Sequence, residues 1–193
     1  MALTLAQYVA EINQNPKDIA EAPLYDDWLK LIKAKNVSYT FARAGQQISF
    51  ASGVSLEVLN PQTPFLKGTE SDIDNNGVVV RLEMGNVSFL ITGDMMWEAE
   101  SELVTRRAHL NSTVLKVAHH GSTTSTTDGF LGVVSPRLAV ISVGKDNPFG
   151  HPTKEVLGRL DAKLGQGNIY RTDVSGTIDL ITDGKKLWMR LQK

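Results

Sequence analysis

Three stretches in the middle of the chain repeat one pattern. Each is an apolar, β-branched run that ends in polar residues beside a glycine, and a helix-compatible segment follows each. The runs, with the polar residues that end them, lie at residues 89–94, 114–122 and 138–144. Continuous apolar runs of this length are typical of strands buried in a parallel sheet. The pattern therefore predicts an α/β fold in which the polar ends of the three runs meet at one edge of a sheet.

The rest of the chain divides into helices and strands by the same criteria. Helical spacing of apolar residues predicts helices at residues 3–13, 24–35, 95–107, 128–134 and 153–164, with Pro152 in the first turn of the last. Alternation and turn residues predict a strand at 37–42, a short strand at 169–171, and hairpins of 47–50 with 54–59, 78–83 with 87–92, and 177–182 with 185–191. We expect one domain over residues 1–193, with a helical segment at 1–36 and a sheet-and-helix body at 37–193.

Composition narrows the classes of function. The net charge of −1 creates no global field that attracts nucleic acid, so any contact with DNA has to be local. The absence of cysteine excludes disulfides and thiolate metal ligands. No apolar run approaches the roughly 18 residues of a membrane span.

Four polar residues at the predicted sheet edge suit metal chemistry: Asp94, His119, His120 and His151. A carboxylate and imidazoles that converge are the ligands that zinc or manganese binds. Asp94 could equally cap the helix that follows it. Of the two adjacent histidines, we expect one to face the site and the other to support it, and spacing does not decide which. His151 is either a plain loop residue or a group that contacts a phosphate oxygen or protonates a leaving group.

Further polar residues have a structural and a functional interpretation. Ser122 either hydrogen-bonds a phosphate or caps the next turn. Lys145 and Arg171 either contact phosphate or simply carry surface charge. Asn75 and Asn76 are first interpreted as a turn, and contact of Asn76 with substrate comes second.

The motifs LITGD (90–94), KVAHHGS (116–122), VISVGK (140–145), GHP (150–152) and YRTD (170–173) followed by GTI (176–178) occur in this order. Together they resemble the metallo-β-lactamase superfamily, and within it the β-lactamase-like domain of ComEC-type DNA-uptake proteins. The resemblance implies an αββα sandwich, of which this chain has the C-terminal portion. It also implies a two-metal site in which Asp94 bridges the ions and His119 or His120 is a ligand. The implied activity is cleavage of a DNA strand during uptake, in a bacterial membrane protein whose domain lies outside the cytoplasm.

The principal metal-binding motif of that superfamily, His-x-His-x-Asp-His or a close variant, is missing. The chain has four histidines, and none precedes His109. We expect a truncated form of a metallohydrolase that is inactive alone. The chain could instead be a degenerate paralogue, or its site could be completed by another polypeptide. The exposed sheet face of a half sandwich predicts a homodimer. The alternative functions are a non-catalytic binding module and a hydrolase of a small phosphoester or lactone.

Overall fold

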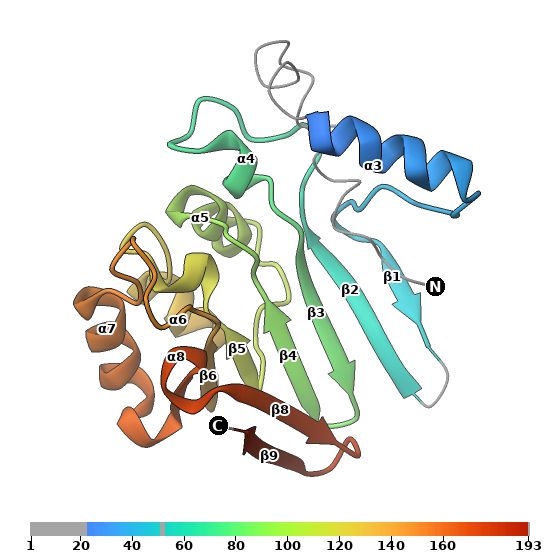
Figure 1. Ribbon diagram of the computed structural model, residues 1–193. Helices are drawn as coiled ribbons and strands as arrows, with labels where there is room; N and C mark the ends of the chain where they lie inside the picture. Colours follow the sequence, from blue (N-terminus) through green and yellow to red (C-terminus); the bar gives the residue numbers. More distant parts are fainter. Residues whose placement is uncertain (1–22, 51–52, 193) are drawn as a thin grey trace.

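The computed structural model describes residues 23–50 and 53–192 and shows a mixed α/β fold (Figure 1). The predicted helix at residues 3–13 lies outside the described residues. The strands are β1 (Gln47–Ser49), β2 (Val54–Asn60), β3 (Val79–Met84), β4 (Val87–Ile91), β5 (Val114–Lys116), β6 (Leu138–Ile141), β7 (Ile169–Arg171), β8 (Thr177–Thr182) and β9 (Leu187–Gln192). The helices are α3 (Pro23–Ala34), α4 (Asp72–Asn75), α5 (Trp97–Thr105), α6 (Asp128–Val134), α7 (Lys154–Leu164) and α8 (Thr172–Ser175), with 3-10 turns η2 (Ala118–Gly121) and η3 (Gln166–Asn168).

Seven strands form one sheet in sequence order from β1 to β7. The neighbours from β1 to β4 are antiparallel, and those from β4 to β7 are parallel. Because β4, β5 and β6 are parallel, the residues that follow them lie at the same edge of the sheet. The parallel sheet predicted from the three apolar runs is therefore confirmed, and it is the reason that residues distant in sequence meet.

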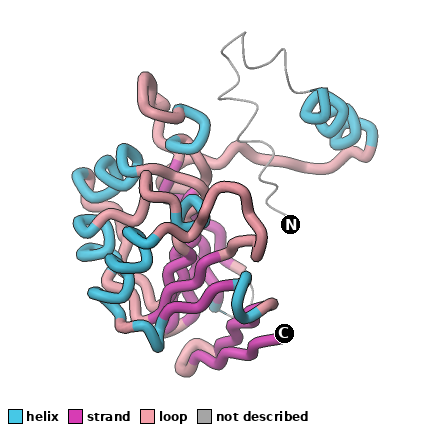
Figure 2. The backbone as a smooth tube through the Cα atoms, turned by 60° about the vertical axis from the view of Figure 1, so that its left-hand side comes forward, coloured by secondary structure: helices cyan, strands magenta, loops and turns pink. Residues whose placement is uncertain are grey.

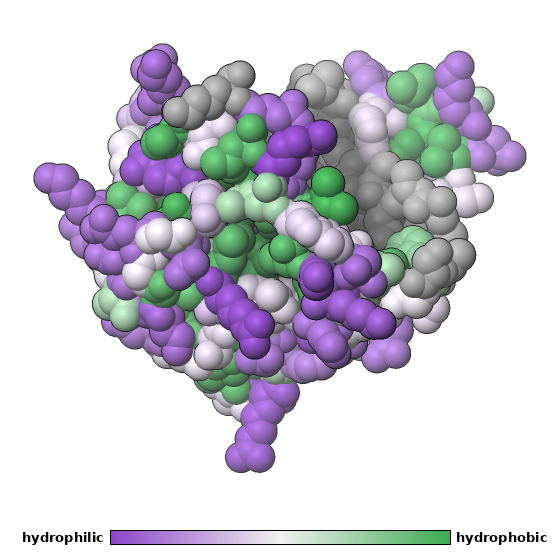
Figure 3. All heavy atoms as spheres, turned by 90° about the horizontal axis from the view of Figure 1, so that it is seen from below, coloured by the Kyte–Doolittle hydropathy of each residue, from purple (hydrophilic) through white to green (hydrophobic). Residues whose placement is uncertain are grey.

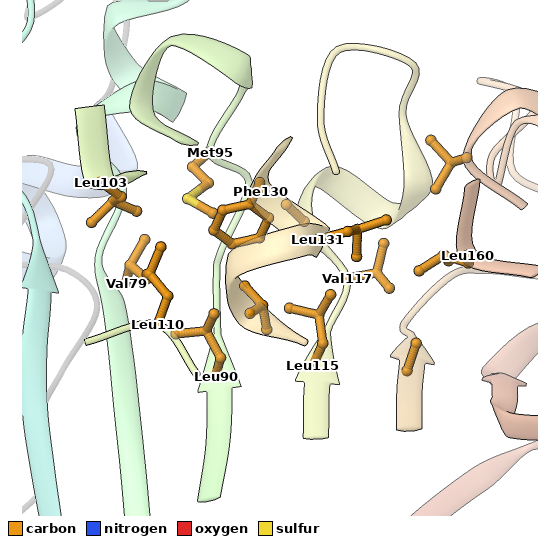
Figure 4. Close-up of a cluster of buried hydrophobic side chains, with 14 of the residues drawn as sticks. Val79, Leu90, Met95, Leu103, Leu110, Leu115, Val117, Phe130, Leu131 and Leu160 are labelled. Atoms are coloured by element: carbon orange, nitrogen blue, oxygen red, sulfur yellow. The ribbon is translucent and has the colours of Figure 1, made fainter. Parts of the chain in front are cut away.

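Helices α5, α6 and α7 connect the parallel strands and lie together on one face of the sheet (Figure 2). The core lies between this helical layer and the sheet. In it Met95 points toward the ring of Phe130, above Leu90 and Leu115 of the central strands (Figure 4). All four side chains are at most 1% exposed. Because these buried side chains pack closely, they fix the positions of the strand ends and of the loops that carry the polar residues.

The opposite face of the sheet has no such layer of helices in the part of the chain that the structure describes. The hairpin of β8 and β9 lies against its lower end, where the backbone N–H of Asn86 donates to the carbonyl of Gly184 at 2.7 Å. Ile91, at the upper end of β4, is exposed on this face. Seen from below, hydrophobic side chains gather in the middle of the molecule, inside a rim of hydrophilic ones (Figure 3).

Two expectations about local structure are wrong. Residues 37–42 alternate but form no strand; Tyr39 and Phe41 instead meet in an edge-to-face contact with ring centroids 5.9 Å apart. Pro152 precedes the N-cap of α7, which is Thr153, and so lies outside the first turn.

No helix in the described ranges is long and apolar enough to cross a membrane.

Candidate metal centre and its loops

Asp94 follows β4 at the edge where the parallel strands end. The turn before it is held by two contacts to β5 and η2, in which the Thr92 hydroxyl donates to the carbonyl of Lys116 at 2.6 Å and the N–H of His119 donates to the carbonyl of Gly93 at 3.2 Å. Helix α5 begins at Trp97, and Met96 is its N-cap. The interpretation of Asp94 as the cap of this helix is therefore wrong, and its carboxylate is half exposed at the sheet edge.

His119 and His120 do not continue the strand. Strand β5 ends at Lys116, and both histidines have positive φ, 47° and 53°. Left-handed backbone is uncommon in residues other than glycine, and two in succession occur where the surroundings enforce them, often at functional sites. The two side chains contact different partners. The cause is this left-handed turn, and not the alternation of side chains along a strand.

His120 is oriented by the backbone and faces Asp94. Its Nδ1 lies 2.6 Å from the carbonyl oxygen of Ser142. A carbonyl accepts hydrogen bonds only, so Nδ1 carries a proton, and whenever the ring is neutral its lone pair is on Nε2. Nε2 lies 3.5 Å from Oδ1 of Asp94. A lone pair and a carboxylate oxygen at this separation repel each other unless a proton or a cation lies between them.

His119 lies on the other side, against His151. Their ring centroids are 5.9 Å apart in an edge-to-face arrangement, and Nδ1 of His119 lies 3.3 Å from the hydroxyl of Thr124. Burial, and then the neighbouring charges of His119 and His120, lower the pKa of His151. This shift favours the neutral form of the His151 ring, which lies against the ring of His119.

Gly121 lies where two loops touch: the turn that carries His119 and His120, and the loop that carries His151. These are the two histidine loops. A Cβ atom at this position would lie 2.6 Å from Cβ of Pro152, and its φ is +84°. The N–H and the hydroxyl of Thr153 both donate to the carbonyl of Gly121, at 3.0 and 3.1 Å. Only glycine allows this approach, which brings His151 beside His119.

The loop after the histidines is fixed by Glu100, which sequence reasoning missed. Its buried carboxylate accepts hydrogen bonds from the N–H of Thr126 and from the N–H and hydroxyl of Thr127. Arg159 of α7 donates to the carbonyls of Ser125 and Thr126 at 2.9 Å. Burial raises the pKa of Glu100, and these hydrogen bonds oppose that shift. An acidic residue in a helix gives no sequence signal of such a role.

Ser122, Asn75 and Asn76 form hydrogen bonds with neighbouring segments of the protein. The Ser122 hydroxyl is buried, lies 2.9 Å from the hydroxyl of Thr124, and accepts from the N–H of Thr124 at 3.4 Å. The second contact is of the kind that its capping interpretation predicts. The Asn75 side-chain oxygen accepts from the N–H of Met96 and of Ala99, at 3.1 and 3.2 Å, and so caps α5. The Asn76 amide donates to the carbonyls of Leu66 and Asp72 and accepts from the N–H of Leu66. These bonds favour the structural interpretation of both asparagines.

The basic residues differ in their surroundings. Lys145 is exposed in the loop after β6. Arg171 forms a bidentate ion pair with Asp173, so the charge of its guanidinium is already balanced by that carboxylate. Lys116, to which the sequence pattern assigned no role, interrupts an apolar strand. Burial lowers its pKa and the charge of Asp94 opposes that shift, while Nζ lies 3.4 Å from the Gly93 carbonyl.

The donor set fits a metal ion in chemistry and spacing but is incomplete. Two ligands of one tetrahedral ion, with bonds of about 2.1 Å, are about 3.4 Å apart. The separation of Asp94 Oδ1 and His120 Nε2 matches this value. Within the described residues, however, no three His, Asp or Glu side chains gather into a group that could hold an ion. The alternative for this half-exposed pair is a weak ion pair, which contributes about 0–1 kcal/mol.

Comparison with known proteins places the chain beside competence and recombination proteins. It is 31% identical over 163 residues to ComE operon protein 3 of Bacillus subtilis, which covers 84% of this chain and 20% of that protein. It is 39% identical over 129 residues to competence protein ComA of Neisseria gonorrhoeae, covering 65% of this chain and 18% of that protein. Recombination protein 2 of Haemophilus influenzae is 33% identical over 139 residues, 72% of this chain and 16% of the relative. No family model matches. The chain is thus related to these proteins, but it spans a fifth or less of their length.

Proposed function

We propose that this chain is part of a metal-dependent phosphodiesterase domain that cleaves DNA during uptake. The observation that carries the proposal is the Asp94–His120 pair, in which Nε2 and Oδ1 are 3.5 Å apart and Nδ1 is fixed by the Ser142 carbonyl. A histidine ligand commonly donates its other N–H to a carbonyl in this way. The relation to competence proteins and the resemblance to the metallo-β-lactamase superfamily support the same reaction class.

The geometry favours His120 over His119 as the ligand. His120 faces the carboxylate, while His119 contacts His151 and Thr124. A zinc or manganese pair, when bound, would activate water and stabilise charge on the phosphate. The neutral ring of His151 can receive or hand over a proton beside that phosphate. Lys145, in the adjacent loop, can approach a phosphate oxygen.

The remaining ligands have to come from outside the described residues. One sheet with helices on one face corresponds to half of an αββα sandwich, and the other half would cover the opposite face. A longer polypeptide, a second copy of this chain or another protein can supply that half. The proposed homodimer is one form of this arrangement, and it predicts association at micromolar concentration in sedimentation experiments.

Metal titration of single variants tests the proposal. We expect Asp94→Asn and His120→Asn to lower the affinity for Mn²⁺ or Zn²⁺ by at least about tenfold, as loss of groups around a metal does. His109→Asn is the matched control, because His109 lies on the surface with Nδ1 3.7 Å from Glu57. Wild-type affinity in both site variants would show that the pair is not a metal site.

A nuclease assay tests the reaction itself. The polypeptide would include the sequences that flank this chain in its gene, and the substrate would be single-stranded DNA with Mn²⁺. Asp94→Asn should abolish cleavage there, and His109→Asn should not. Retained cleavage in Asp94→Asn would refute the assignment.

The second candidate is a non-catalytic binding module. It is favoured by the absence of a third ligand near Asp94 and His120 among the described residues. Such a module would bind nucleic acid without metal and would leave it intact. Metal analysis of the longer polypeptide therefore separates the two functions. Hydrolysis of a phosphomonoester or lactone in place of DNA would indicate the smaller-substrate alternative.

A further inference from the structure

Phe149 presents its ring to solvent beside the candidate site. Its side chain is 76% exposed, the highest fraction among the large hydrophobic residues described as exposed. A single exposed hydrophobic residue is ordinary on a protein surface. The position of Phe149 next to His151, and the rigidity of the loop that carries it, distinguish it from the others.

The loop between β6 and α7 is held in shape by Asn147. Its side-chain amide donates to the carbonyls of Gly144 and His151, at 3.0 and 2.7 Å, and its oxygen accepts from the N–H of His151 at 3.0 Å. These three bonds close the loop on both sides of Phe149. The ring is therefore presented by an ordered backbone, which lowers the entropic cost of binding a ligand on it.

The ring of Phe149 stacks on His151 and continues a row of rings that starts in the candidate site. The centroids of Phe149 and His151 are 5.8 Å apart and the planes are inclined by 27°, which is a stacked arrangement. His151 in turn contacts His119, whose neighbour His120 faces Asp94. The row thus leads outward from the proposed metal ligands to the exposed face of Phe149.

We propose that Phe149 is a stacking platform for one base of a single-stranded nucleic acid whose phosphate lies at the Asp94–His120 pair. The inference rests on the proposed function and names the substrate form that the site accepts. In a duplex the bases are stacked on one another and cannot reach the ring. In a single strand every base offers a π face, so stacking of this kind tolerates any sequence.

The charges of the loop indicate that stacking, and not phosphate attraction, dominates this contact. Lys145 is followed directly by Asp146, and both are exposed. The chain as a whole has a net charge of −1. Few counterions are then released on binding, so the affinity for a single strand should fall only weakly as salt increases.

Binding of short oligonucleotides by this chain tests the inference without catalysis. Fluorescence anisotropy would follow a labelled oligodeoxyadenylate in the presence of Mn²⁺, because without a cation the Asp94 carboxylate repels the phosphate. We expect Phe149→Ala to weaken binding about 5- to 150-fold, the range for the loss of one base–aromatic stack. Phe149→Trp should retain the affinity. Trp188→Ala is the matched control, because Trp188 is also an exposed aromatic, at 49%, but belongs to the separate β8–β9 hairpin.

An oligonucleotide with abasic sites separates base stacking from backbone contact. Its affinity should be low and should not change with Phe149→Ala. Equal affinities of wild type and Phe149→Ala for the normal oligonucleotide, or no binding by the wild type, would overturn the inference. The proposed function fails by a different result, which is cleavage or metal binding that survives Asp94→Asn. Thermal unfolding of each variant would confirm that it is folded.

Discussion

Replacing Gly121 with alanine should separate the two histidine loops. The added Cβ would lie 2.6 Å from Cβ and 3.0 Å from Cα of Pro152, closer than carbon atoms pack. The Pro152 backbone cannot rotate away as a flexible side chain would, so the loop that carries His151 has to move. The edge-to-face contact of His151 with His119 would then be lost.

Two costs add up in this variant. Alanine at φ +84° is in the left-handed region, which costs a non-glycine residue about 1–3 kcal/mol. Forcing a methyl group into a packed contact costs about 1–3 kcal/mol more. The free energy of unfolding should therefore fall by about 2–6 kcal/mol, with the lower end expected if the loop shifts freely.

Urea unfolding of wild type and variant measures this loss, with Gly158→Ala as the control. Gly158 lies inside α7, and a Cβ there meets no atom within 4 Å. The same substitution should therefore stabilise the protein by about 0.5–1 kcal/mol at that position. NMR titration of His151 in Gly121→Ala should also show its pKa return toward the ordinary value, because the displaced ring is less buried and the neighbouring imidazoles are more distant. A stability within about 0.5 kcal/mol of wild type, with an unchanged His151 titration, would refute the packing argument.

Three further predictions concern the supports of the site. Asn76→Asp would place a carboxylate oxygen against the Leu66 and Asp72 carbonyls and should cost about 1–3 kcal/mol in urea unfolding, whereas a neutral effect would mean that this amide is not structural. Burial holds the folded-state pKa of Glu100 above its ordinary 4.5. As pH rises from about 4.5, the unfolded chain therefore releases this proton before the folded protein does, and the free energy of unfolding should fall. Glu100→Gln should lack this slope, and parallel pH curves for the two proteins would contradict the burial of the carboxyl. If the site binds metal, Mn²⁺ at 100 times its Kd should stabilise wild type by about 2.7 kcal/mol, as measured by unfolding with and without EDTA. The same concentration should stabilise Asp94→Asn by at most about 1.4 kcal/mol.

The arrangement of the strands that carry the candidate site could be predicted, because it follows from the apolar runs in the sequence. Apolar runs of strand length identified β4, β5 and β6. The rule that parallel strands share their carboxyl edge predicted that Asp94, His119, His120 and His151 lie at one edge of the sheet. Of the adjacent histidines, one was expected to face the site and the other to support it; in the structure the two rings contact different partners. The strand expected at 37–42 failed because alternation describes which side chains share a face, while a strand also needs a neighbour with which to pair.

The class of fold, the sheet edge of the candidate site and the residue types expected at that edge all follow from patterns in the sequence. The folded structure selects the histidine that faces Asp94, because this depends on a left-handed turn and on a carbonyl 22 residues from His120, at Ser142. It also decided that Asn75 caps α5 and that Glu100 holds the loop at Thr126 and Thr127, 26 and 27 residues distant. These are hydrogen bonds between segments that only the packed core brings together, and no periodicity in the chain encodes them.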